Sequence, residues 1–296
     1  MSPMSPRTLR PRQTLHPEAA NWAARVVANG GSVSGSTLSA VSRFCRAIDG
    51  AGIRDRFYRL NLFCGGTSGT AVGINSALVP LYRGQSLGGT QFGNTIDANA
   101  GGGAAFIGSD YAETGAGGGL LGSAASGKFL NTGFPTNTLA EGNRHISAYE
   151  TLRSGQTFDA FLGSETAAGV GQQQFMMFYG GNNQIVNFGF GGFAASLTST
   201  ATTGAGHWLG VNSPSGTGLI YRNGSQDTTG TAATATPTSS SIFVFAINRA
   251  ANATPQTDFF NGRLGGYSIG LAMTAPQAAA YYTAMQEFQT ALSRNV

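Results

Sequence analysis

The second half of this chain contains a succession of short segments in which apolar and polar side chains alternate, separated by turns rich in glycine and polar residues. Alternation with a period of two residues is typical of β-strands. The segments are residues 145–149, 158–162, 175–179, 185–190, 207–211, 219–221 and 242–247. Asn223-Gly224 predicts a tight hairpin, because both residues tolerate positive φ. Short strands at this spacing favour an antiparallel β-sandwich or jelly roll, traced as a meander, over a fold of βαβ units.

The low charge of the chain supports an all-β body. Charged residues make up 10% of the sequence, whereas soluble domains usually contain about 25%. The 45 glycines are about twice the usual share and suit tight turns better than long solvated helices. We therefore expect a mainly β protein.

Two helices are predicted ahead of the strands, in residues 17–57. The first begins at Pro17 and ends at Gly30-Gly31, since proline is favoured in the first turn and glycine after the last. Ser34 or Ser36 caps the second. Its apolar residues follow three- and four-residue spacing, at Leu38, Val41, Phe44, Cys45 and Ile48. We expect a small helical hairpin.

A closing helix is predicted at the C-terminal end. Thr274-Ala-Pro-Gln277 matches a capping box with proline in the first turn, and the apolar spacing continues to about Leu292. The expected organisation is an extended arm in residues 1–16, the helical hairpin in residues 17–57, and a sandwich with its closing helix in residues 58–296.

The predicted arm is basic. Residues 1–60 carry nine arginines against three acidic residues, a balance of +6. Lys128 is the only lysine and no basic stripe continues beyond Arg59, so we expect no nucleic-acid binding. Arginine is well suited to ion pairs at interfaces. The candidate residues for docking on a partner subunit are therefore Arg7, Arg10 and Arg12.

Membrane insertion, secretion, metals and cofactors are not predicted. No apolar run approaches the ~20 residues that span a bilayer, and residues 1–7 lack the apolar core of a signal peptide. Cys45 and Cys64 have no Cys-x-x-Cys or Cys/His ligand spacing. We expect both to be buried thiols.

Gly84-Gln-Ser-Leu-Gly88 matches the pattern of a hydrolase nucleophile elbow, with Ser86 as the candidate nucleophile. No helix-forming run follows it, and such a site also needs a base. His16 lies in the predicted arm, while His145 and His207 lie at the starts of predicted strands. This context does not support an esterase.

Carboxylates do not form a recognisable catalytic or calcium site either. A glycosidase needs two carboxylates across one face, but Asp110 and Glu113 are three residues apart and would point to opposite faces of a strand. We expect them to be solvated charges at a strand edge. Asp97-Ala-Asn99 offers too few oxygen ligands for calcium. The sequence therefore predicts a non-enzymatic protein without a metal.

The last third of the chain resembles the concanavalin A-like or laminin-G-like sandwich family. The resemblance rests on the sequences Leu219-Ile-Tyr-Arg-Asn-Gly224, Ile242-Phe-Val-Phe-Ala-Ile247 and Phe260-Asn-Gly-Arg-Leu-Gly-Gly-Tyr-Ser-Ile-Gly270, followed by the helix that opens at Thr274. It covers roughly residues 105–296 and implies a lectin-like sandwich. Fold alone does not fix activity.

The first part of the chain resembles the helical preamble of proteins encoded by tailed bacteriophages, in which a lectin-like sandwich follows. The similar sequences run from Trp22 to Gly31 and from Tyr58 to Gly65. The resemblance implies a virion component, such as a capsid decoration or tail-fibre protein, with capsid or tail subunits as partners.

Two functions are therefore expected. The first is a non-enzymatic structural protein of a phage virion, attached by its arm with the sandwich facing outward and forming a homo-oligomer. The alternative is a carbohydrate-binding module or adhesin that recognises a host-surface glycan without a metal. Exposed aromatic rings beside amides would serve that purpose, and the candidates are Tyr179, Asn182, Asn183 and Trp208.

Overall fold

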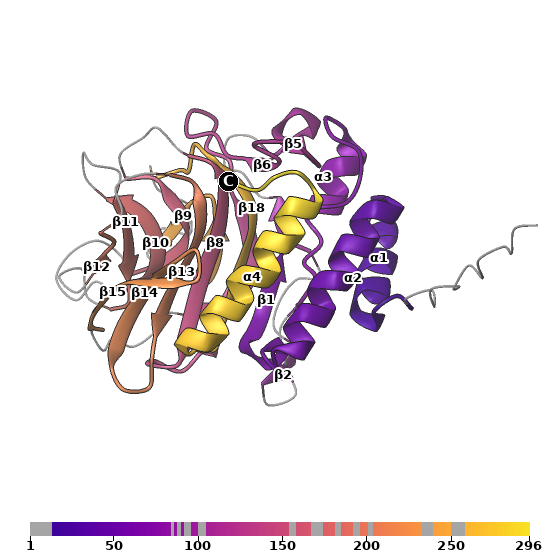
Figure 1. The fold of residues 1–296 in the computed structure, drawn as a ribbon. Coiled ribbons are helices and arrows are strands. Elements are labelled where there is room, and N and C mark those ends of the chain that lie inside the picture. Colours follow the sequence, from indigo (N-terminus) through magenta and orange to yellow (C-terminus); the bar gives the residue numbers. More distant parts are fainter. Residues whose placement is uncertain are drawn as a thin grey trace, which may run out of the picture.

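Two antiparallel β-sheets face each other across an apolar core, and helices cover the outer face of one of them (Figure 1). The computed structural model describes residues 14–83, 86–87, 90–91, 96–99, 105–153, 158–166, 174–180, 185–191, 196–200, 204–232, 239–249 and 258–296. The expected mainly β sandwich with helices at both ends of the chain is confirmed.

The first sheet contains the long central strands of the fold. Pairing is antiparallel throughout, and β1 (Phe57–Asn61) also pairs with β18. Its strands lie in the order β15 (Ser225–Thr231), β14 (Thr217–Arg222), β13 (Gly206–Asn212), β8 (Arg144–Leu152), β18 (Arg263–Gly270), β6 (Gly119–Leu121) and β5 (Tyr111–Ala112).

The second sheet packs against the inner face of the first. Its strands lie in the order β12 (Leu197–Thr198), β11 (Ile185–Gly189), β10 (Gln174–Gly180), β9 (Ala160–Glu165), β16 (Ser241–Val244), β7 (Leu130–Pro135) and β4 (Ala98–Asn99). One parallel pairing joins β17 (Ile247–Arg249) to β9. A separate pair consists of β2 (Ser86–Leu87) and β3 (Thr90–Gln91).

The strands do not form a single meander, which corrects the expected connectivity. Strands β9 to β12 form one meander in the second sheet, and β13 to β15 form another in the first. Between these runs the chain crosses from one sheet to the other. The predicted Asn223-Gly224 hairpin joins β14 to β15, with φ of 49° and 77° at its two residues.

In the described residues, four α-helices accompany the sandwich: α1 (Pro17–Ala28), α2 (Gly35–Gly50), α3 (Ala71–Ala77) and α4 (Ala275–Ala291). Short 3-10 turns occur at Arg54–Arg56, Gly108–Asp110 and Thr136–Thr138. The predicted caps are present. Ser34 Oγ accepts a hydrogen bond from the backbone N–H of Thr37 at 3.1 Å, and Thr274 and Gln277 form a capping box. No helix was predicted at α3, whose glycine and polar residues give no clear stripe.

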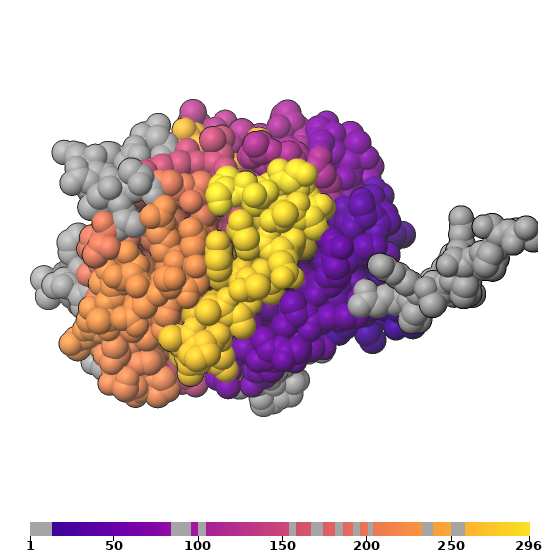
Figure 2. Space-filling model, viewed as in Figure 1, coloured from indigo at the N-terminus to yellow at the C-terminus, as the bar shows by residue number. Residues whose placement is uncertain are grey.

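The helices and the first sheet share a second apolar core. The rings of Phe44 on α2 and Phe288 on α4 meet edge to face with centroids 6.0 Å apart. Strand β8 is buried on both faces, because Ile146 and Ala148 face the core between the sheets while Tyr149 faces the helices. Figure 2 shows α4 (yellow) lying between the strands of the sandwich (orange) and α2 (indigo).

Among the helices of the described residues, none combines the length and the apolar character that a bilayer-spanning helix requires. Both cysteines are buried free thiols, as expected.

Candidate anion-binding pocket

The residues that the sequence offered for glycan stacking are buried. Tyr179 is 1% exposed, and its hydroxyl donates to Glu150 Oε2 at 2.6 Å. Trp208 is 2% exposed and lies under the Arg222 guanidinium, 5.2 Å from the ring centroid. Neither ring presents a face to a sugar. The other candidates that the sequence offered lie outside the described residues: Asn182, Asn183, Arg7, Arg10 and Arg12.

A histidine lies beside two serines in the structure, an arrangement that was not predicted from the sequence. The group is buried. His145 Nε2 lies 2.9 Å from Ser268 Oγ, which lies 2.6 Å from Ser147 Oγ. All three residues are completely buried, so no substrate can reach them. Ser86, the residue of the elbow pattern, lies in the short strand β2, and the next element in the described part of the chain is the strand β3.

Asp110 and Glu113 are buried ion-pair partners, and the expectation that they are solvated charges is wrong. Asp110 Oδ2 lies 2.6 Å from Lys128 Nζ, and Glu113 Oε2 lies 3.3 Å from Arg294 Nη2. Asp97, the nearest calcium candidate, is completely buried against Arg59. These carboxylates balance buried cations in the fold. The partners come from distant segments, which is why spacing in the sequence did not reveal them.

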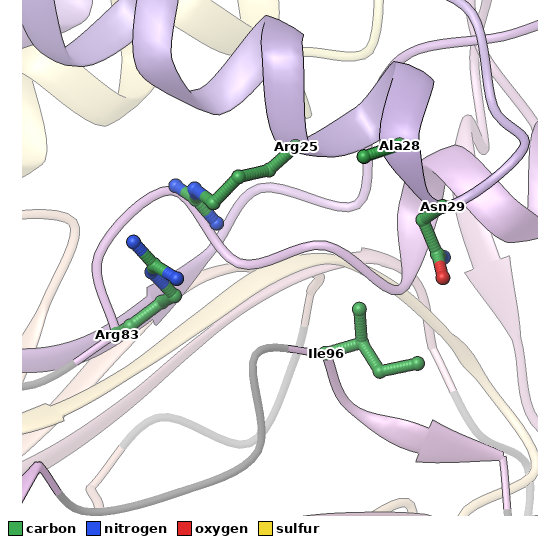
Figure 3. A pocket seen from close by; sticks show the side chains of 5 residues that line it. All are labelled: Arg25, Ala28, Asn29, Arg83 and Ile96. Atoms are coloured by element: carbon green, nitrogen blue, oxygen red, sulfur yellow. The ribbon is translucent and has the colours of Figure 1, made fainter.

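A pocket lies between the C-terminal half of α1 and the segment that leads from α3 toward β2 (Figure 3). Its volume is about 250 Å³. Two guanidinium groups, one amide and two small apolar surfaces form its wall. The lining residues are Arg25, Ala28, Asn29, Arg83 and Ile96.

Arg25 is fixed in place by three hydrogen bonds. Its Nη1 donates to the Pro80 carbonyl at 2.7 Å, its Nη2 to the Leu81 carbonyl at 2.9 Å, and its Nε to Asn21 Oδ1 at 3.0 Å. Burial, followed by the nearby charge of Arg83, lowers the pKa of Arg25 to about 10. The group therefore remains a cation at neutral pH, in a place that disfavours cations.

Arg83 supplies a second positive charge, and no carboxylate of the described residues pairs with it. It is partly exposed and makes no hydrogen bond or ion pair with any residue in the described part of the chain. Figure 3 shows its guanidinium on the same side of the pocket as that of Arg25. Like charges at short range repel, and an anion between them would relieve that repulsion. The pocket is therefore suited to a carboxylate or another small anion.

Sequence reasoning did not single out either arginine. Arg25 lies on a helix that was correctly predicted, but no pattern connected it to Arg83, which lies 58 positions further along the chain. The two meet because the segment after α3 returns to α1, where Trp22 Nε1 donates to the Val79 carbonyl at 3.0 Å. The excess of arginine in residues 1–60 includes Arg25 but not Arg83, so it gave only half of the signal.

The architecture is that of an antiparallel β-sandwich, and solved structures of this class are similar to parts of the chain. Domain 4 of AbnA, a GH43 extracellular arabinanase from Geobacillus stearothermophilus in complex with arabinotriose, shares 16% identity over 64% of this chain and 85% of that one, with a TM-score of 0.41. The CBM40 of the Ruminococcus gnavus IT-sialidase shares 10% identity over 48% and 83%, with a TM-score of 0.35.

The NanB sialidase from Streptococcus pneumoniae is similar over a smaller share of its own length. It shares 14% identity over 62% of this chain, which spans only 28% of the sialidase chain, with a TM-score of 0.40. No family model and no curated protein matches the sequence. Similarity at this level does not extend to function.

Proposed function

We propose that this chain is a non-enzymatic carbohydrate-binding module that binds an acidic sugar in the pocket between Arg25 and Arg83. The observation that carries the proposal is the Arg83 guanidinium, which has no counterion among the described residues although a second arginine lies beside it. Arginine binds carboxylates through two parallel hydrogen bonds, which gives both affinity and orientation.

The rest of the lining matches the other surfaces of a sugar. Asn29 lies at the end of α1, and its Nδ2 donates to the Asn75 carbonyl at 2.8 Å, which holds the amide at the edge of the pocket. Amides pair with hydroxyl groups, while Ala28 and Ile96 offer apolar surface to C–H groups. A volume of about 250 Å³ is slightly below that of typical small-ligand sites and suits one sugar unit.

The direct test compares acidic and neutral glycans and then changes one arginine. A glycan array identifies the best acidic ligand, and calorimetry compares it with the same ligand after methyl esterification of its carboxylate. Binding is expected to require the free carboxylate. Replacing Arg83 with Gln should weaken binding about 10–100-fold, because a charge-assisted hydrogen bond contributes about 1.5–3 kcal/mol.

Arg43 provides the matched control for that substitution. It is an exposed arginine on α2, outside the pocket lining. Arg43→Gln changes the net charge equally and should leave glycan binding unchanged. Equal losses in both variants would mean that only overall charge matters. Binding of DNA in preference to every acidic glycan would reject the carbohydrate proposal.

A second proposal concerns attachment to a virion through residues 1–13. The chain is fixed just after this segment, because the His16 backbone N–H donates to Ser42 Oγ at 2.9 Å and Arg46 donates to the Thr14 carbonyl. The described chain therefore begins at a point that is held on α2, and residues 14–16 of the predicted arm contact this helix. The sandwich and the carbohydrate pocket would then project from the particle, so the two proposals are compatible.

Removal of residues 1–13 tests this attachment. A chain that begins at Thr14 keeps the contacts of His16 and is expected to retain the melting temperature of the full chain. It should nevertheless be missing from purified virus particles in which the full chain is detected by mass spectrometry. Incorporation of the shortened chain at the normal level would contradict the proposal.

A further inference from the structure

Three side chains of the types that bind transition metals meet at the start of α1. They are His16, the N-cap of the helix, Glu18 in its first turn, and Cys45 on α2. One ligand atom from each lies within 4.8 Å of the other two. The three residues are 2 and 27 positions apart, and the packing of α1 on α2 brings them together.

The hydrogen bonds of His16 identify Nδ1 as the unprotonated ring nitrogen, and a metal ion would replace the helix-capping hydrogen bond that this atom now accepts. Its Nε2 lies 2.9 Å from Asp49 Oδ2, where it donates, and Nδ1 accepts from the Glu18 backbone N–H at 3.2 Å. In metal sites, a histidine ligand usually donates its other ring N–H to a carboxylate, which fixes the tautomer and the ring orientation. Asp49 occupies that position.

A carboxylate and a tyrosine hydroxyl lie beside the thiol. Glu18 Oε1 accepts from Arg54 Nε at 2.6 Å, while its Oε2 is buried without a well-formed hydrogen bond in the described part of the chain. Tyr82 is 1% exposed, and its hydroxyl interacts with both Glu18 and the Cys45 thiol. The hydroxyl therefore belongs to the same cluster as the three candidate ligands.

We infer that His16, Glu18 and Cys45 bind a divalent transition-metal ion, with the Tyr82 hydroxyl or a water molecule in the fourth position. Nitrogen, oxygen and thiolate ligands together are typical of zinc, whereas calcium and magnesium prefer oxygen alone. On binding, the thiol proton passes to solvent and the thiolate sulfur coordinates the metal. The two negative charges of Glu18 and the thiolate, with that of Asp49, balance Arg54 and the divalent ion.

The required movement is small. Bonds of about 2.0–2.3 Å from zinc to its ligands place tetrahedral ligand atoms roughly 3.3–3.8 Å apart. The three ligand atoms lie within 4.8 Å of one another, so they need to approach by about 1 Å, which side-chain rotation can provide. Arg54 stays in place meanwhile, because its guanidinium lies 3.7 Å above the centre of the Tyr82 ring as well as bonding Glu18.

Cobalt(II) is the probe that reports both binding and the identity of the ligands. The untagged full chain, freed of metal with a chelator, is titrated with cobalt chloride. One equivalent should produce a thiolate-to-cobalt charge-transfer band in the near ultraviolet, together with the intense visible bands of four-coordinate cobalt. One equivalent of zinc chloride should abolish both and raise the melting temperature.

The second cysteine supplies a matched control. Cys45→Ser should abolish the charge-transfer band, whereas Cys64→Ser, at a thiol that is equally buried, should leave it unchanged. Asp49→Asn removes only the orienting carboxylate and should weaken binding about 10–100-fold without loss of the band. Glu18→Gln, which keeps the shape of the side chain, should weaken binding more than Asp49→Asn does.

Two results would overturn the inference. One is a full chain that binds no cobalt or zinc at micromolar concentration, and the other is a cobalt spectrum that is the same in the Cys45→Ser variant and the full chain. If Cys45→Ser fails to fold, the Glu18→Gln comparison decides instead. Affinity for zinc that is unchanged in that variant would exclude the site.

Discussion

Between pH 7 and pH 4.5, two buried histidines are expected to remove on the order of 5 kcal/mol from the free energy of unfolding. Burial lowers the pKa of His145 to about 4 and that of His207 to about 3, whereas an unfolded histidine titrates near 6.5. Below pH 6.5 the unfolded chain therefore binds protons that the native protein does not. Each histidine then lowers the free energy of unfolding by about 1.4 kcal/mol per pH unit, over about two pH units.

One carboxylate acts in the opposite direction. Burial raises the pKa of Asp159 to about 6, so the native protein takes up this proton before the unfolded chain does. Between pH 6 and pH 4 the protonation of Asp159 thus stabilises the native state and offsets part of the loss. A comparison of variants separates the histidine contribution from this background.

His207→Phe isolates one of the two histidines. Both nitrogens of His207 lack a hydrogen-bond partner among the described residues, and its ring packs between Tyr149, Tyr281 and Tyr282. Phenylalanine keeps this packing without a titrating group. Between pH 7 and pH 4.5, the free energy of unfolding of the variant should fall by about 2.7 kcal/mol less than that of the native chain. Urea unfolding of both proteins at pH 7, 5.5 and 4.5 measures this difference. Parallel pH profiles for the two proteins would contradict the expectation.

Arg59→Met is expected to lower the free energy of unfolding by about 3–5 kcal/mol, because it leaves a buried carboxylate without its cation. Arg59 and Asp97 are completely buried, with Nη2 2.5 Å from Oδ1. Tyr267 donates to the same oxygen at 2.6 Å, and Asn61 donates to Oδ2 at 2.7 Å. These two neutral donors remain in the variant but do not replace the charge.

The double variant Arg59→Met, Asp97→Asn shows whether charge is the cause. An amide at position 97 removes the unpaired negative charge and keeps most of the side-chain volume. The double variant should recover about 1–3 kcal/mol relative to Arg59→Met alone, the range observed for residues in direct contact. Chemical denaturation measures all three variants and the native chain. No recovery would mean that lost packing, and not the buried carboxylate, explains the effect.

The sequence predicted those parts of the fold that depend on local patterns. Period-two alternation located most strands, and the apolar stripes with their caps located α1, α2 and α4. Local patterns do not determine which sheet a strand joins, so the expected single meander was wrong. They also do not predict the parallel pairing of β17 with β9, because that contact joins Ile247 to Gly163, which lie far apart in the sequence.

The candidate sites were harder to predict, for the same physical reason. Tyr179 and Trp208 were correctly placed on strands, but alternation alone does not say which face of a strand turns toward the core. Arg25 and Arg83 meet through the return of the chain after α3, and His16 meets Cys45 through helix packing. Neither arrangement leaves a spacing motif in the sequence.

The pairing of β1 with β18 connects the beginning of the sandwich to its end, and the Arg59–Tyr267 hydrogen bond within it joins residues 208 positions apart. Arg294, close to the end of the described chain, also contacts early segments, because its guanidinium donates to the carbonyls of Phe63 and Glu113. During synthesis, β1 must therefore wait until residues 263–270 have left the ribosome before it finds its neighbour. Contacts of such long range slow folding, so newly made chains should depend on chaperones until β18 and Arg294 have been synthesised.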